Sequence, residues 1–247
     1  MSQIRYLPVG DSALTVDFGS EITEATNIRV QALARHLEQN PWPGVLETLP
    51  TFRSLLIAYD PLQISFDALC EKLKALTAET TGPQKARKRI FEIPVCYGAR
   101  FGADLRDAQK LTGLTSDEII AFHSGRDYRI YMLGFLPGFP YLGGLDERLY
   151  MPRLQNPRTK IPAGSVGIGG TQTGVYPMES PGGWRLLGAT PMKLYDPNRE
   201  KPILYEAGDF IRFRPISVDE YYDIHRMAEA DAYECRVIEE PEGGDLS

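Results

Sequence analysis

The residues of this sequence that could do chemistry lie on a stretch rich in glycine, proline and aromatic residues, from Tyr131 to Pro191. Its centre is GFLPGFPYLGG, from Gly134 to Gly144, where three aromatic residues stand among two prolines and four glycines. Proline removes a backbone donor and glycine costs conformational entropy, so this composition favours a shaped loop. Two interpretations stay open: a Gly/Pro-rich β domain with aromatic turns, or a concave site built from several loops.

Arginines on the same loops suggest an anionic ligand. Arg153 and Arg158 stand on either side of a proline turn, and Arg185 follows Trp184. A guanidinium group binds a carboxylate or a phosphate through two parallel hydrogen bonds, although each arginine could equally form a surface salt bridge. We predict that substrate or partner binding involves Phe135, Pro137, Phe139, Tyr141, Arg153, Arg158, Gln172, Tyr176, Trp184 and Arg185.

Of the three histidines, only His123 is a candidate for acid–base catalysis, because it lies just before the glycine-rich stretch. The alternative is a cation near the end of a short helix, where it would offset the helix dipole. No two histidines have metal-ligand spacing, and the three cysteines form neither a disulfide framework nor a metal-binding pair. No metal site is predicted.

Two familiar catalytic motifs are incomplete. Gly169 and Gly174 have the glycine spacing of a phosphate-binding loop, but Val175 and Tyr176 occupy the positions that require Lys and Ser or Thr. Ser165 lies in AGSVG, which lacks the first glycine of a nucleophile elbow. The chain therefore shows no complete catalytic set of its own.

The elements that must position these residues divide into two groups. The first eighty residues alternate strands with amphipathic helices, which favours a small α/β sandwich over residues 1–84. Its expected elements are strand 13–18, helix 23–39, strands 45–49 and 54–59, and helix 65–78, with Ser65 as a helix cap.

A polar segment over residues 80–88 marks the predicted domain boundary. After a strand over 89–97 and two short helices, many short apolar runs separated by glycine and proline predict a β-barrel or sandwich. A terminal helix is expected over 217–230. The predicted fold class is α+β, with domains at residues 1–84 and 89–230 and an acidic tail at 231–247 that is expected to be mobile over residues 239–247.

Composition narrows the functional class. The 247-residue chain carries a net charge of −6, which disfavours nonspecific binding to nucleic acid or to a membrane surface. We find no secretory signal and no apolar run of about 18 residues. A cytoplasmic protein is expected.

The motif YMLGFLPGFPYLGG, from Tyr131 to Gly144, resembles the KipI family, also called allophanate hydrolase subunit 1, whose enzyme members are the PxpB subunit of 5-oxoprolinase. The resemblance continues through residues 157–158, 161–167, 172–177 and 179–184, and back to residues 93–98 and 10–14. It covers nearly the whole chain to about Ile216. Two positions depart from the family pattern, Ala103 and Thr171.

The resemblance implies a cyclophilin-like barrel after the N-terminal domain. It further implies a subunit of an ATP-dependent 5-oxoprolinase, inactive alone, that helps to open a small acidic lactam to glutamate. The implied cofactor is ATP, and the implied partners are a KipA/PxpC-type subunit and a PxpA-type subunit. The alternative is a regulatory protein that inhibits a sporulation histidine kinase. Prolyl isomerase activity is disfavoured because the cyclophilin pattern F-H-R-V-I is absent.

Overall fold

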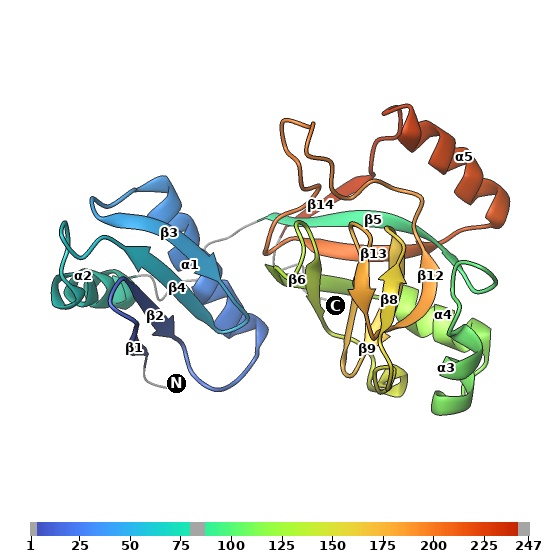
Figure 1. Cartoon of the computed structure of the whole chain (residues 1–247), viewed down its shortest axis with the longest axis horizontal. Coiled ribbons are helices and arrows are strands. Elements are labelled where there is room, and N and C mark those ends of the chain that lie inside the picture. The colour runs from blue at the N-terminus through green and yellow to red at the C-terminus, as the bar shows by residue number, and fades with distance from the viewer. Residues whose placement is uncertain (1–3, 80–86, 242–247) are drawn as a thin grey trace. The chain divides into compact units, whose positions relative to one another are not determined.

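The computed structural model describes residues 4–79 and 87–241. These residues form two compact units, one within Met1–Ala86 and one within Arg87–Ser247 (Figure 1). The linker predicted over residues 80–88 lies largely outside the described residues. Each unit has its own hydrophobic core. The predicted α+β class is confirmed.

The first unit is a four-stranded antiparallel sheet with two helices. Its elements are β1 (Arg5–Val9), β2 (Ala13–Asp17), α1 (Glu24–Gln39), β3 (Val45–Pro50), β4 (Ser54–Tyr59) and α2 (Phe66–Glu79), in the sheet order β1-β2-β4-β3. Thr23 caps α1 by accepting a hydrogen bond from the Thr26 amide, and Ser65 caps α2 through the Ala68 amide. The alternating pattern of the sequence therefore predicted this unit well.

The second unit holds the glycine-rich stretch. Its elements are β5 (Arg87–Tyr97), α3 (Leu105–Thr112), α4 (Ser116–Ser124), β6 (Asp127–Leu133), β7 (Pro140–Gly143), η1 (Glu147–Leu149), β8 (Arg158–Ile161), β9 (Ser165–Gly169), β10 (Gln172–Val175), β11 (Ser180–Gly182), β12 (Arg185–Ala189), β13 (Phe210–Pro215), α5 (Val218–Glu229) and β14 (Val237–Pro241). Thr115 and Glu118 form a capping box at the start of α4.

Seven of these strands close into a barrel. The order is β12-β9-β10-β7-β6-β13-β5, and pairing of β12 with β5 completes the circle. β13 runs parallel to β5, from Phe210 opposite Ile90 to Pro215 opposite Val95. β8 and β11 form a separate two-stranded sheet. The predicted barrel is thus present, and the glycine-rich loops connect its strands.

The alternation of β13 shows how the barrel separates its core from its surface. Ile211 and Phe213 are buried in the core, while Arg212 and Arg214 between and after them point outward. Arg212 forms a bidentate ion pair with Asp127 on β6. Successive strand residues face opposite sides, so one strand supplies both core and surface ion pairs. Figure 1 shows α5 on one side of the barrel, with α3 and α4 together on another.

The C-terminal segment differs from its prediction. The acidic tail predicted over residues 231–247 contains β14, which pairs antiparallel with β5, from Val237 opposite Phe91 to Pro241 opposite Arg87. Lys88 Nζ of β5 lies 3.3 Å from a carboxylate oxygen of Glu240, so acidic side chains of β14 lie beside basic side chains of β5. The mobility predicted for residues 239–247 is therefore wrong for residues 239–241.

Candidate functional site

One pocket in the barrel unit collects most of the predicted binding residues. We call it the aromatic pocket. It has a volume of about 300 Å³ and is lined by Phe135, Phe139, Tyr141, Arg153, Pro157, Tyr176, Pro181, Gly182, Gly183 and Trp184. Loops and strands far apart in the sequence contribute these residues. The concave-site interpretation of the sequence is the one that this geometry favours.

Phe139 is the centre of the aromatic cluster behind the pocket. Its ring makes edge-to-face contacts with Phe135, Tyr141, Tyr176 and Trp184, at centroid distances of 5.3–5.6 Å. It is only 2% exposed. Edge-to-face pairs add attraction beyond the area that they bury. Phe139 therefore holds the pocket together more than it offers a surface to a ligand.

Glycines allow Trp184 to lie flat against the barrel strands. A Cβ at Gly169 would lie 2.3 Å from Trp184 Cδ1, and one at Gly174 would lie 3.1 Å from Trp184 Cζ3. A side chain at position 169 would overlap the indole ring, and one at position 174 would force the ring to shift slightly. Close packing of Trp184 thus requires Gly169 and favours Gly174.

Phe135 and Arg153 are the exposed aromatic and the exposed charged residue of the pocket lining. Phe135 is 62% exposed, and its backbone lies in the left-handed region at φ +66°, which a non-glycine residue rarely adopts. Strained residues of this kind concentrate at functional sites. The Arg153 guanidinium lies 5.9 Å from the Trp184 ring centroid. Together they place one apolar and one cationic group at the pocket entrance.

Tyr176 supplies a buried hydroxyl group to the pocket. Burial raises its pKa to about 12, while Arg153 and a hydrogen bond from the Trp184 amide act in the opposite direction. The phenol therefore stays neutral at physiological pH. Its oxygen accepts a hydrogen bond and its side chain is only 2% exposed, so Tyr176, like Phe139, belongs to the packed cluster behind the pocket.

Arg158 lies outside the aromatic pocket. Its Nη2 donates to Asp104 Oδ1 at 2.7 Å, and its Nη1 donates to the Trp184 carbonyl at 3.4 Å. Asp104 is 4% exposed and also accepts from the Leu186 amide. Since this carboxylate is buried, the guanidinium balances its charge. Arg158 thus ties β8 to the start of α3.

Three other predicted residues do not line the aromatic pocket. They are Pro137, Gln172 and Arg185. Arg185 Nε donates to the Pro152 carbonyl at 2.9 Å, which fixes the loop that carries Arg153. Pro137 is exposed next to Phe135. Their participation in binding stays a prediction.

His123 lies in the barrel core, where it is fully buried. Its Nδ1 is 2.7 Å from the Tyr97 hydroxyl, and its Nε2 is 2.7 Å from Thr173 Oγ1. Thr173 donates its only hydroxyl proton to the Gly167 carbonyl, so it must accept from Nε2–H, and Tyr97 then donates to Nδ1.

Burial lowers the pKa of His123 to about 3, which keeps the ring neutral. The ring also stacks on Phe213, with centroids 4.7 Å apart. Both nitrogens are occupied within the protein, and the residue lines neither the aromatic pocket nor the larger groove described below. The acid–base role predicted for His123 has no support in this position, which is that of a core residue.

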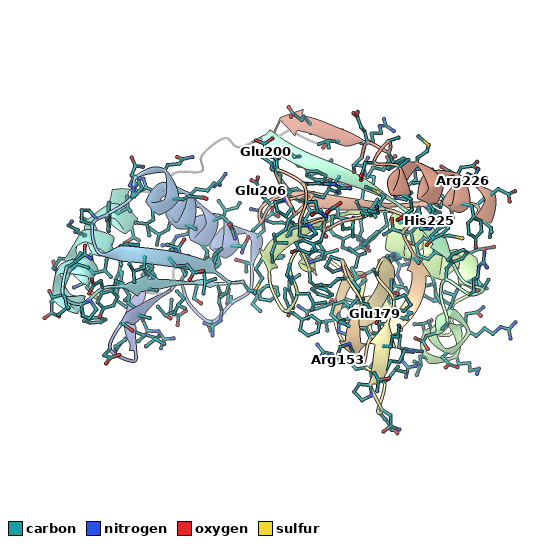
Figure 2. All side chains as sticks on the ribbon, turned by 45° about the horizontal axis from the view of Figure 1, so that its top comes forward. Arg153, Glu179, Glu200, Glu206, His225 and Arg226 are labelled. Carbon is teal, nitrogen blue, oxygen red and sulfur yellow. The ribbon has the colours of Figure 1, made fainter. Side chains whose placement is uncertain are left out.

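A second and larger hollow, of about 520 Å³, lies beside α5. We call it the cationic groove. Its lining residues are Arg100, Phe101, Ala103, Arg158, Lys160, Pro162, Ala163, Ser165, Leu186, Ala189, Tyr221, Tyr222 and His225. Figure 2 shows His225 on α5 and Arg153 on the lower part of the barrel unit, so the two pockets open at different places.

Sequence reasoning selected only Arg158 from the cationic groove. Arg100–Phe101 lies in a loop after β5, and Tyr221, Tyr222 and His225 lie on the terminal helix expected over 217–230, to which no function was assigned. Their signal was the spacing of Tyr221, Tyr222 and His225, which places an aromatic cluster on one side of a helix. An aromatic cluster on a helix indicates a binding site only once the loop that faces it is known, here the loop that carries Arg100 and Phe101.

Within the part of the chain that the structure describes, no group of three or more His, Cys, Asp or Glu residues is placed to hold a metal ion. In the same residues we find no helix whose length and apolar character would suit a membrane span.

Comparisons with known proteins agree with the sequence resemblance. Residues 4–205 match the family model of the carboxyltransferase domain, subdomain C and D. The chain is 43% identical to a 5-oxoprolinase subunit of Bacillus subtilis over 224 residues, which covers 87% of this chain and 93% of that protein.

Solved structures show the same fold. A conserved uncharacterized protein of Pyrococcus horikoshii is 43% identical, with a TM-score of 0.52 over 88% of this chain and 100% of that chain. The urea amidolyase of K. lactis has a TM-score of 0.79 over 96% of this chain and 16% of its own length, at 22% identity. The second likeness concerns the fold alone.

Proposed function

Because this chain belongs to the family of the carboxyltransferase domain, subdomain C and D, we propose that it is one subunit of an ATP-dependent 5-oxoprolinase. The observation that carries the proposal is the 43% identity to the 5-oxoprolinase subunit of Bacillus subtilis, which extends over 93% of that protein. A likeness of this extent involves both structural units and the loops of the aromatic pocket.

The reaction is the opening of a five-membered lactam. Water adds to the amide carbonyl of 5-oxoproline, the C–N bond breaks, and the product is glutamate with a free amino group. Hydrolysis of ATP to ADP and phosphate drives the step. The aromatic pocket holds no nucleophile paired with a base among its described lining residues, so the proposal assigns the bond-breaking groups to a complex with other subunits.

We assign binding of the lactam to the aromatic pocket. A volume of about 300 Å³ suits a small ring compound. The exposed Phe135 ring offers an apolar surface. Arg153, which lies over the Trp184 ring, is the cation for the carboxylate of 5-oxoproline.

The first test reconstitutes the complex. The chain is co-expressed with its candidate KipA/PxpC-type and PxpA-type partners, and 5-oxoproline-dependent release of phosphate and glutamate is measured. We expect turnover from the complex and none from the chain alone. Turnover by the single chain, or a pure complex without activity on 5-oxoproline, would contradict the proposal.

The second test concerns Arg153. In the active complex, Arg153→Ala should raise the KM for 5-oxoproline by about tenfold or more, because a charge-assisted hydrogen bond contributes about 1.5–3 kcal/mol. Arg153→Lys keeps the charge without the fork and should give a smaller increase. Arg226→Ala is the matched control, since Arg226 is exposed on α5 and pairs with Asp223. An unchanged KM in both Arg153 variants would remove this residue from the site.

A further inference from the structure

We propose that the cationic groove binds a nucleoside phosphate, with Arg100 and Lys160 on the phosphate oxygens and the rings beside α5 as the surface for the base. The inference deepens the proposed function, since it rests on that function for the identity of the nucleotide as ATP. The groove itself is argued from its charge, its rings and the loop that carries Arg100.

The groove is lined by positively charged side chains although the protein as a whole carries a net negative charge. Its lining includes Arg100, Arg158 and Lys160, and none of its described lining residues is an aspartate or a glutamate. The neighbouring hollow shares Tyr221 and His225 with the groove, and adds Lys193 together with the carboxylates of Glu179 and Glu229. An anion is therefore attracted to the Arg100 end of the groove.

The three cations differ in their availability. Arg158 is fixed on the buried Asp104 carboxylate. Lys160 pairs with Glu179 at 2.8 Å, but both side chains are more than half exposed, so the pair is weak and a phosphate can replace it. Arg100 is exposed and, within the described chain, contacts only aromatic rings. Arg100 and Lys160 are thus the groups free to bind phosphate.

Aromatic rings form the adjoining wall. The Arg100 guanidinium lies 5.1 Å from the Phe101 ring and 4.9 Å from the Tyr222 ring. Phe101 packs on Tyr221 at 4.3 Å, and Tyr221 stacks on His225 with an interplanar angle of 20°. Purine and pyrimidine bases stack on aromatic side chains and on guanidinium planes. The cations can contact a phosphate and the adjacent rings can stack on a base, so the groove suits a nucleoside phosphate better than it suits inorganic phosphate.

The loop that carries Arg100 is held in one conformation. Gly98 and Ala99 both have left-handed backbones, at φ +71° and +46°, and Ala99 is not a glycine. The amides of Phe101 and Gly102 both donate to the Gly98 carbonyl. A Cβ at Gly102 would lie 1.9 Å from the Leu187 carbonyl, so the loop is pressed onto β12. This rigidity positions Arg100 before a ligand arrives, which lowers the entropic cost of binding.

The primary experiment measures binding of Mg-ATP to the full-length chain by isothermal titration calorimetry, with adenosine and inorganic tripolyphosphate as separate ligands. We expect saturable binding of Mg-ATP, and weaker binding of each part. Equal affinity for tripolyphosphate would overturn the role of the rings, and equal affinity for adenosine would overturn the role of the cations. Absence of saturable Mg-ATP binding would overturn the proposal.

Variants locate the site. Arg100→Ala should weaken Mg-ATP binding by about tenfold or more, because charged hydrogen bonds to phosphate are lost, and Arg100→Lys should weaken it less. Arg106→Ala is the matched control, since Arg106 is exposed on α3 and does not line the groove. Hydrogen exchange on addition of Mg-ATP should protect residues 98–102 and 218–225. Wild-type affinity in Arg100→Ala, or protection confined to residues 135–141, would contradict the assignment.

Kinetics of the complex separate this inference from the proposed function. In an active complex, Arg100→Ala should raise the KM for ATP and leave the KM for 5-oxoproline unchanged. A complex that binds nucleotide in the groove without acting on 5-oxoproline contradicts the proposed function only. An active complex whose KM for ATP is insensitive to Arg100 contradicts the inference only.

Discussion

At the scale of single residues, substitutions of Phe139 and Phe135 distinguish a packing role from a binding role. Phe139→Ala removes a ring that contacts four other aromatic residues in a buried cluster. We expect a loss of about 3–5 kcal/mol in the free energy of unfolding, measured by urea denaturation. The loop sequence alone suggested a contact surface at Phe139, whereas its 2% exposure assigns it a structural role.

Phe135→Ala is the matched comparison. The ring is 62% exposed, so its removal should change the free energy of unfolding by less than about 1 kcal/mol. The same variant should raise the KM for 5-oxoproline in the complex. Equal destabilisation by both substitutions would show that the whole loop is packing, with no ligand-facing side.

His123 gives a prediction about pH. The folded protein holds this residue neutral, with its pKa lowered to about 3, whereas the unfolded chain protonates it near pH 6.5. The unfolded state therefore binds more protons between these values, and stability falls as the pH falls. The contribution of one such group is at most about 1.4 kcal/mol per pH unit.

The measurement is urea unfolding of His123→Gln at several pH values between 6 and 4, since glutamine keeps hydrogen-bonding groups but does not titrate. We expect a smaller decrease in stability than in the wild type over this range. His36→Gln, outside the barrel core, is the control and should follow the wild type. Parallel pH curves for wild type and His123→Gln would mean that the buried ring does not contribute.

The residue types of the aromatic pocket were predictable, but their roles were not. Aromatic and arginine residues on glycine-rich loops pointed to Phe135, Tyr176, Trp184 and Arg153, which the structure brings together. Arg158 is an arginine like Arg153 and follows the same proline turn in the sequence. Its fixation on Asp104 depends on a residue 54 positions away, which no local pattern reveals.

At the scale of elements, the Trp184 ring explains Gly169 of β9 and Gly174 of β10. Gly169→Ala would place a methyl group 2.3 Å from the Trp184 indole, so the ring or the strand must move. We expect destabilisation of about 1–3 kcal/mol, with a shift in tryptophan fluorescence. Thermal unfolding and emission spectra measure both.

A second substitution tests the cause. Trp184→Phe makes room for the added methyl group, so the double variant should be more stable than the sum of the two single effects predicts. Strict additivity would show that Gly169 is needed for its backbone and not for the ring above it.

The helices and strands of the first unit followed from periodicity and caps, because neighbouring residues determine both. Thr23 and Ser65 both lie where the sequence placed helix starts. β14 was missed because its acidic composition is typical of a solvated tail. Its partner strand is more than a hundred positions earlier, so only the tertiary fold identifies it.

At the scale of the whole molecule, the two units divide the work in a way that a truncation can test. Both pockets lie in the barrel unit, so a chain that begins at Arg87 should fold and bind its partner subunit. The cut must precede Arg87, because β5 pairs with β14 from that residue onward. Circular dichroism and a pull-down of the partner check the prediction. A fragment that folds but binds no partner would make the first unit part of the functional surface.

The closure of the barrel also sets an order of events during protein synthesis. β5 is the first barrel strand to leave the ribosome, yet its parallel neighbour β13 comes much later, as the 120 positions between Arg89 and its ion-pair partner Asp209 indicate. Until then one side of β5 has no strand to pair with, and loop closure over such a distance is slow. All described strand pairs of the first unit lie within residues 5–59, so this unit can fold while the rest is translated. A nascent barrel unit would therefore be the part of this protein that a chaperone at the ribosome exit most needs to shield.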